Sequence, residues 1–198
     1  MDNEVLKALR ERRSIRSFKA EQITNEELQT VLESGTWAPT GKGLQSPYIV
    51  AVQNAKQLDW LRKENAKLME VSSNPYYGAP TIVLVFAPKE WPNNVKDGSL
   101  VLGNMMLAAH SLGLGSCWIN REEKMFETAE GQQLMRDWGL PEGLIGIGAL
   151  HWAILRLIPR PSNLVKPIII VSLNSPFHRN FQKGKVTHAF PFLMPCWV

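Results

Sequence analysis

Four arginines gather near the N-terminus of this chain, in the stretch RERRSIRSF. They are Arg10, Arg12, Arg13 and Arg16, and Ser14 lies among them. Guanidinium groups bind oxyanions through paired, planar hydrogen bonds, and a serine hydroxyl adds a short donor. The stretch therefore has three candidate roles, which are a solvated basic face, a contact for nucleic acid, and a cradle for a single phosphate.

The distribution of charge separates these roles. The chain carries a net charge of +4, and residues 151–198 hold six Lys and Arg but no Asp or Glu. The remaining 150 residues hold 16 basic and 18 acidic side chains and are slightly acidic. Nucleic-acid binding needs positive charge spread over a surface that follows many phosphates. A compact arginine cluster on an acidic body favours a single phosphate and predicts no nucleic-acid partner.

Length and composition indicate an ordinary globular protein. The 198 residues suffice for one domain with a sizeable core. No apolar run is long enough for a membrane span and the N-terminus lacks the pattern of a signal peptide, so we expect no membrane contact and a cytoplasmic location. Cys117 and Cys196 make no disulfide framework, and the four histidines are scattered, so no metal site is predicted.

Apolar periodicity predicts alternating helices and short strands. A Thr24–Glu27 capping box begins one helix, and Gly35 is expected to end it. The glycines of LIGIGAL predict close backbone approach. Helices are expected over residues 3–12, 24–35, 55–70, 97–115 and 130–139, strands over 48–53, 81–87, 116–119 and 144–150, and a loop over 37–47.

Several segments, in this order, resemble the FMN-dependent nitroreductase family. They are RRSIRSF (12–18), APTGKGLQSP (38–47), YYGAPTIVLV (76–85), and GNMMLAAHSLGLGSCWI (103–119) followed by GLPEGLIGIGAL (139–150). The resemblance implies an α+β fold with a mixed, mostly antiparallel sheet flanked by helices. It also implies an obligate homodimer with the cofactor at its interface. The expected organisation is an FMN-binding domain, 1–150, and an atypical C-terminal tail, 151–198.

The resemblance implies a set of cofactor-binding residues. Arg12 and Arg16 would approach the FMN phosphate, and Arg13 and Ser14 would contact the phosphate, the ribityl chain or the ring edge. The loop of the partner subunit would lie against the flavin, and the GLGSCWI strand would offer backbone N–H groups near N5 and O4. The matching positions are Pro39, Thr40, Gly41 and Gln45 in the loop, and Trp118 and Ile119 in the strand. Gly43 departs from the family, in which many members have Asn.

The implied activity is a ping-pong oxidoreductase reaction. NADH or NADPH would give a hydride to flavin N5 and leave, and a nitroaromatic, a quinone or a similar electron-poor acceptor would take its place. Because the flavin carries the chemistry, no catalytic acid, base or nucleophile is predicted. Tyr76, Tyr77 and Trp118 are candidates to line the acceptor pocket, and the two tyrosines are equally candidates for the core. The alternative is a flavin-binding or inactive homologue with impaired cofactor binding.

The tail after Leu150 departs from the family. Members continue with Gly-Tyr and a stretch rich in Lys, Pro and Arg, whereas this chain reads HWAILRLIPRPSNLV. His-Trp-Ala-Ile is encoded CAY-TGG-GCN-ATH, and reading begun two bases later gives YTG-GGC-NAT, which encodes Leu-Gly and then Tyr, His, Asn or Asp. We therefore hypothesise a frameshift from about residue 151, which would remove the arm that crosses to the partner subunit and one phosphate ligand. A divergent tail is the alternative.

Overall fold

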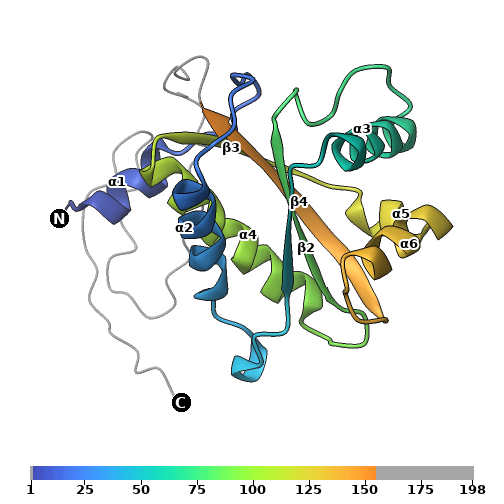
Figure 1. The fold of residues 1–198 in the computed structure, drawn as a ribbon. Helices are drawn as coiled ribbons and strands as arrows, with labels where there is room; N and C mark the ends of the chain where they lie inside the picture. Colours follow the sequence, from blue (N-terminus) through green and yellow to red (C-terminus); the bar gives the residue numbers. More distant parts are fainter. Residues whose placement is uncertain (1, 155–198) are drawn as a thin grey trace, which may run out of the picture. The chain divides into compact units, whose positions relative to one another are not determined.

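The structure of this protein is a computed structural model, and it describes residues 2–154. These residues form a four-stranded sheet with helices on both faces (Figure 1). The expected α+β architecture is confirmed. Of the tail, 151–198, the described part is its first four residues, and the expected dimer-exchange arm lies outside the described residues.

The sheet has the strand order β1-β2-β4-β3, and each of these neighbouring pairs is antiparallel. Central strand β2 is buried along almost its whole length. This explains its unbroken apolar sequence, because a strand covered on both faces needs no alternation of polar residues. The strands are β1 (Tyr48–Val52), β2 (Thr81–Pro88), β3 (Leu114–Ile119) and β4 (Leu144–Ile154).

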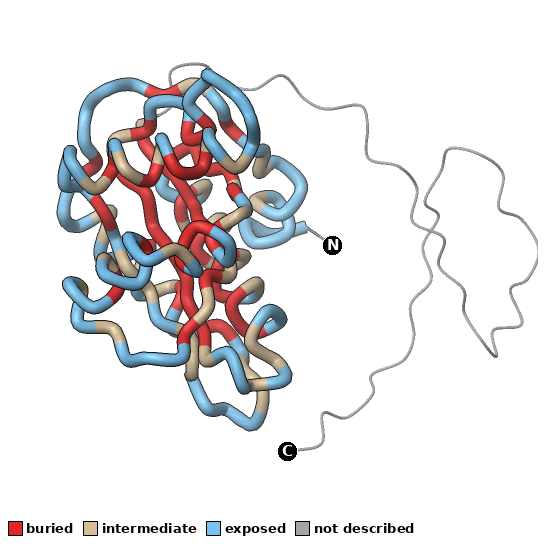
Figure 2. The backbone as a smooth tube through the Cα atoms, turned by 90° about the vertical axis from the view of Figure 1, so that its right-hand side faces the viewer, coloured by how far each residue is buried: buried red, intermediate tan, exposed pale blue. Residues whose placement is uncertain are grey.

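Helices cover the two faces of the sheet and enclose two apolar clusters. On one face α4 (Asn94–Ser111) packs between the sheet and α2 (Asn25–Thr36), and α1 (Glu4–Glu11) contacts α4. On the other face lie α3 (Ala55–Met69), α5 (Glu122–Glu127) and α6 (Ala129–Asp137). Figure 2 shows the buried positions concentrated in the strands between these layers.

Helix α2 begins as predicted but ends differently. Its N-terminus has the full capping box between Thr24 and Glu27. Gly35, expected to end the helix, lies inside its last turn and is buried. A Cβ at this glycine would lie 2.9 Å from Ile49 Cδ1 and 3.0 Å from Met105 Cγ. The glycine therefore serves close packing between α2, β1 and α4, and its predicted role as a terminator is wrong.

Other boundaries differ from the sequence prediction for local reasons. Helix α4 starts three residues before Asp97 and ends at Ser111, because the chain turns at Gly113 with a positive φ of 76°. Strand β4 continues to Ile154, four residues past the expected end, because His151 and Trp152 pair with both β2 and β3 and the last two residues pair with β3. Helix α4 is buried on its inner side and reaches the surface at Val95 and Leu100, which are 56% and 47% exposed.

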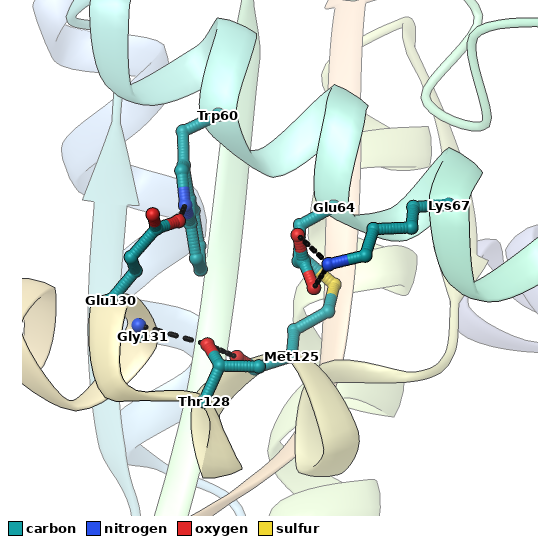
Figure 3. Close-up of polar contacts among 7 residues, drawn as sticks. All are labelled: Trp60, Glu64, Lys67, Met125, Thr128, Glu130 and Gly131. Atoms are coloured by element: carbon teal, nitrogen blue, oxygen red, sulfur yellow. Dashed lines mark hydrogen bonds and ion pairs between the residues drawn. The ribbon is translucent and has the colours of Figure 1, made fainter.

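Polar contacts attach the helices on the second face to one another (Figure 3). The indole Nε1 of Trp60 in α3 donates to Glu130 Oε2 in α6 at 3.0 Å. Thr128 caps α6 by accepting from the Gly131 N–H, and Lys67 pairs with Glu64 within α3. A groove of about 380 Å³ lies between α3 and α6, and none of the residues proposed for cofactor binding lines it.

Candidate functional site

The arginine segment is attached to the outer edge of strand β3. The Ile15 N–H donates to the Ser116 carbonyl at 2.9 Å, and Ser14 and Ser116 form a parallel bridge. Two segments about a hundred residues apart in the sequence therefore lie side by side. The structure brings the predicted residues Arg12–Arg16 next to the strand that contains the predicted Trp118 and Ile119.

The arginines of this segment have different surroundings. Arg13 Nη1 donates to the carbonyl oxygens of Arg10 at 2.6 Å and Arg12 at 2.7 Å, so it stabilises the C-terminus of α1. Arg12 Nη1 lies 4.0 Å from Met106 Sδ in α4, and the Arg16 guanidinium lies 6.0 Å from the Tyr77 ring centre.

Arg12 and Arg16 are available to an anion. Within residues 2–154 neither guanidinium is paired with a carboxylate, and Ser14 between them is exposed. Two arginines and a hydroxyl without an acidic partner suit the oxygens of a phosphate group. The donor set therefore fits the phosphate of FMN, with Arg13 committed to the helix end.

The direction of the backbone along β3 distinguishes Trp118 from Ile119. Strand β3 is an edge strand of the described sheet. The N–H and C=O of one residue point to the same edge, and those of the next residue point to the other. Because the Ser116 carbonyl points outward to Ile15, the Trp118 N–H also points outward, whereas the Ile119 N–H points toward β4. This geometry favours Trp118 as the backbone donor.

Glycines of β4 allow neighbouring elements to approach closely: the backbone of Glu122 at Gly146, as the sequence predicts, and the Trp118 side chain at Gly148. A Cβ at Gly148 would lie 2.5 Å from Trp118 Nε1, and one at Gly146 would lie 2.6 Å from the Glu122 carbonyl carbon. The Trp118 indole is half-buried and packs against the cluster around α4. Its Nε1 has no hydrogen-bond partner among the described residues.

The predicted loop segment is held together by its own side chains. The Gln45 N–H donates to Thr40 Oγ1 at 2.9 Å, and the Thr40 hydroxyl lies 3.0 Å from Gln45 Oε1. Gln45 also donates to the Thr36 carbonyl at 3.0 Å, and Pro39 is exposed beside this pair. The short helix η1 (Gly41–Gly43) and Gln45 contain three left-handed residues, with φ values of 56° at Lys42, 65° at Gly43 and 48° at Gln45.

The loop and the arginines lie apart in one chain. The Gly41 N–H donates to Asp97 Oδ1 at 2.9 Å, near the start of α4. Arg12 contacts Met106 in the second half of the same helix. Nine residues of α-helix separate these two contacts, a rise of roughly 14 Å. Figure 1 shows η1 beyond the first turns of α4 and α1 near its other end. The described chain thus does not bring Thr40, Gly41 and Gln45 to Arg12 and Arg16.

A buried polar network follows the end of β3, and sequence reasoning did not find it. Asn65 Nδ2 donates to the Asn120 carbonyl and to the Tyr76 hydroxyl, each at 3.1 Å. The Tyr76 hydroxyl donates to Glu122 Oε1 at 3.1 Å, and Arg121 Nε donates to Asn65 Oδ1 at 2.9 Å. Burial raises the pKa of Glu122 to about 8 and that of Tyr76 well above its ordinary value. The network fixes the turn between β3 and α5.

The two tyrosines proposed for the acceptor pocket have different positions. Tyr76 is completely buried and belongs to the core cluster under the sheet, so it does not line an open pocket. Tyr77 is 41% exposed, with a positive φ of 53°, and its ring lies below the Arg16 guanidinium. Tyr77 therefore remains a candidate to line the acceptor pocket. The sequence alone did not distinguish it from Tyr76, because the two tyrosines are adjacent and identical.

His151 and Trp152, the first residues after Leu150, are buried without hydrogen-bond partners. Both ring nitrogens of His151 and the Nε1 of Trp152 are unpaired among the described residues. The His151 ring meets Phe18 edge-on at 5.0 Å between ring centres. Burial lowers the pKa of His151 to about 4. The strand pairing is kept at these positions, but the side chains do not match their apolar surroundings.

The described residues can also be compared with the requirements of metal sites, membrane spans and reactive cysteines. No three His, Cys, Asp or Glu side chains lie close enough to hold a metal ion in this part of the chain. No helix in the same part is both long and apolar enough to cross a bilayer. The single described cysteine, Cys117, is a buried packing residue on the β3 strand.

The fold and site define an α+β protein with an arginine-rich segment attached to the edge strand of an antiparallel sheet. The model described as "Nitroreductase family" matches residues 9–150. This chain belongs to the nitroreductase family.

Known relatives and structures agree with this assignment. A nitroreductase with bound FMN from Bacteroides fragilis is 30% identical with a TM-score of 0.77, and the match covers 86% of this chain and all of that one. One from Desulfitobacterium hafniense, also with bound FMN, is 25% identical with a TM-score of 0.76, and the match covers 87% of this chain and all of that one. A protein of Archaeoglobus fulgidus, provisionally named NADH dehydrogenase/NAD(P)H nitroreductase, is 29% identical over 72% of this chain and 80% of its own length.

Proposed function

We propose that this protein is an FMN-dependent NAD(P)H oxidoreductase that reduces nitroaromatic, quinone or similar electron-poor acceptors by ping-pong hydride transfer. The observation that carries the proposal is the arginine segment attached along the open edge of β3. Its backbone follows the same strand edge as the outward Trp118 N–H, and the guanidinium groups of Arg12 and Arg16 have no carboxylate partner among the described residues. The FMN bound in the Bacteroides fragilis structure supports the same cofactor here.

The chain's own residues would bind and orient the cofactor. Arg12 and Arg16 hold the phosphate, Ser14 donates to the phosphate or the ribityl chain, and the Trp118 N–H approaches the polar edge of the ring. A bound flavin supplies two-electron redox chemistry between NADH or NADPH and the acceptor. A backbone N–H held by the sheet is a fixed donor and needs no reorganisation during the reaction.

The complete site requires a homodimer. Thr40, Gly41 and Gln45 lie away from the arginines of their own chain, so a second copy would bring them to the cofactor across a two-fold interface. Apolar side chains near the arginine segment and near the loop are exposed in the single chain, and a second subunit could cover them. Helix α1 has no buried residue, and Val5 and Leu9 are 66% and 53% exposed, while Trp37 before the loop is 77% exposed.

The second candidate is a homologue that binds flavin weakly and turns over poorly. Gly43 has no side chain to contact the flavin and no atom of the described structure near its Cβ position. The unpaired His151 and Trp152 weaken the strand that supports β3. The hypothesised frameshift would explain these two residues, and most of the tail that it concerns lies outside the described residues.

The first experiment is a visible absorption spectrum of the purified protein, before and after FMN is added, followed by anaerobic NADH or NADPH. A flavin band that bleaches with the reductant and returns with a quinone or nitroaromatic acceptor supports the enzyme. A protein that binds FMN but is not reduced, or that binds none, supports the second candidate.

Substitution of the two arginines tests the site itself. We expect Arg12→Ala and Arg16→Ala each to raise the FMN dissociation constant by about tenfold or more, because each removes a charge-assisted hydrogen bond worth roughly 1.5–3 kcal/mol. Binding is measured by quenching of flavin fluorescence. Arg136→Ala, on the exposed surface of α6, is the matched control and should leave the affinity unchanged. Equal affinity in all three variants would place the phosphate elsewhere.

A further inference from the structure

Asp97 is a carboxylate buried at the start of an apolar helix. It lies in the first turn of α4 and is 3% exposed. Its two oxygens accept from two different segments: Oδ1 from the Gly41 N–H at 2.9 Å and Oδ2 from the Trp91 indole Nε1 at 2.7 Å. A buried carboxylate persists where such partners replace its hydration. Asp97 therefore connects α4, the segment before it and the loop that contains Gly41.

The loop fits closely against this anchor. A Cβ at Gly41 would lie 2.7 Å from Asn93 Nδ2 and 2.8 Å from Trp91 Cζ2, so the loop backbone lies directly on these side chains. The Lys42 ammonium lies 5.9 Å from the centre of the same Trp91 ring. The Thr40–Gln45 pair fixes the inside of the loop, and Asp97 fixes where the loop lies on the helix.

We infer that Asp97 is a positioning residue for the FMN site of the partner subunit. The inference rests on the proposed function, in which the loop of one subunit lies against the flavin of the other. Asp97 does not touch the cofactor in this arrangement. It acts through the Gly41 N–H, and the Trp91 indole holds its second oxygen in place. Left-handed backbone at Lys42 and Gln45 is energetically costly, and the Asp97 anchor helps to hold the loop in this conformation.

Asp97→Asn tests the anchor with little change in shape. The amide keeps one acceptor oxygen but turns an N–H group toward either Gly41 or Trp91, so one donor loses its acceptor. We expect the FMN dissociation constant to rise about tenfold and the flavin absorption band to shift, with a fall in melting temperature no larger than one lost buried hydrogen bond accounts for. Asp59→Asn, at an exposed ion pair of α3, is the matched control and should change neither.

Two further measurements separate positioning from a general loss of structure. Trp91→Phe leaves the carboxylate and removes one donor, and it should weaken FMN binding less than Asp97→Asn does. If Asp97→Asn does not fold, this variant carries the test. Hydrogen exchange of the Gly41 amide in the cofactor-free protein should be faster in both variants, and unchanged exchange would overturn the anchor whether or not FMN binds.

A mixed dimer tests whether Asp97 acts in the partner subunit. One differently tagged subunit carries Asp97→Asn and the other carries Arg12→Ala with Arg16→Ala. If the loop serves the partner, both defects fall on one site and the other site is intact, so half of the sites bind FMN with wild-type affinity. If the loop serves its own subunit, no wild-type site remains, which overturns the inference. A wild-type dimer that binds no FMN would instead overturn the proposed function.

Discussion

At the scale of single residues, His151 is the side chain least suited to its place. It pairs across the sheet with Cys117 and Ile82, and aromatic rings surround it. The Arg16 guanidinium lies over the Tyr77 ring, which contacts His151, and its positive charge also disfavours a protonated imidazole. Folding therefore favours the neutral ring, whose nitrogens make no well-formed hydrogen bond among the described residues and have the Ile15 backbone as their nearest polar group.

The expected effect of His151→Leu is a more stable protein. The substitution removes two unsatisfied buried nitrogens and keeps about the same volume, which should add about 1–3 kcal/mol to the free energy of unfolding. In the alternative reading frame the bases shared by the His151 and Trp152 codons encode leucine, so the gain would also agree with the frameshift hypothesis. Urea unfolding at pH 7 measures it, with His110→Gln in α4 as the control. A loss of stability would mean that the ring packs better than its polar atoms suggest.

Protonation of His151 should also make the fold sensitive to acid. Its pKa is lowered from 6.5 to about 4, so its contribution to stability is complete above pH 6.5 and is lost as the pH falls toward 4. The loss amounts to about 3 kcal/mol over this range. This loss of stability in acid should be absent from the His151→Leu variant, which has no imidazole at this position.

At the scale of elements, the turn from β3 to α5 depends on the buried network around Glu122. Arg121 has a positive φ of 93°, which is unfavourable for a residue with a side chain, and its Nε–Asn65 hydrogen bond holds that conformation. Glu122 Oε2 has no partner among the described residues, and the carboxyl group is favoured in its neutral form. The conformation at the end of β3, next to Trp118, thus depends on the protonation state of Glu122.

Stability should fall in alkali because of Glu122. Its pKa rises from 4.5 to about 8, so its contribution is complete below pH 4.5 and is lost as the pH rises through 8. We expect Glu122→Gln to be more stable than the wild type at pH 8 to 9, by about 5 kcal/mol at most. Melting curves from pH 4 to 9 measure it, with Glu123→Gln as the exposed control. Parallel curves for variant and wild type would show an ionised, well-solvated Glu122.

The two titrations oppose each other between pH 4.5 and 6.5. In this range the contribution of His151 to the free energy of unfolding rises with pH, and that of Glu122 falls. The wild type should therefore have a broad maximum there, and each single variant should expose the slope of the remaining group. Tyr76 contacts both residues, because its ring meets His151 and its hydroxyl donates to Glu122. The effects of the two substitutions on stability are therefore not expected to be strictly additive.

Local patterns predicted most of these elements, and contacts distant in the sequence account for the rest. The capping box of α2 and the apolar run of β2 depend on neighbours within a few residues, so the sequence alone indicates them. Helix α5 has six residues, which is too short for a period to be recognised. The Asp97–Gly41 contact joins positions 56 apart, and the one signal for it was a lone carboxylate in an apolar helix.

At the scale of the whole molecule, helix α1 exposes its apolar side chains, and no packing within the described chain accounts for them. The helix has a capped N-terminus at Asn3 and an anchored C-terminus at Arg13, yet none of its residues is buried. A helix of eight residues is marginal by itself in water, and packing usually supplies its stability. A second subunit over α1 would supply that packing close to the arginines.

We expect Leu9→Glu to dissociate the dimer and to release FMN together. The substitution places a charge on the exposed apolar side of α1, where it changes no buried contact of the single chain. Sedimentation should show a monomer, and flavin should be lost in the same range of protein concentration. Met69→Glu, at the end of α3 on the other side of the sheet, is the control. A dimer that keeps its flavin would show that α1 is not at the interface.

The bridge between Ser14 and Ser116 has a consequence for protein engineering. The hydrogen bond that holds the arginine segment uses the Ile15 N–H and the Ser116 carbonyl, so it does not depend on the side chain at position 14. Residue 14 can therefore be varied without moving the backbone that presents its neighbours. A library at this position would tune anion selectivity on a fixed scaffold, whereas proline at position 15 would remove the N–H and release the segment.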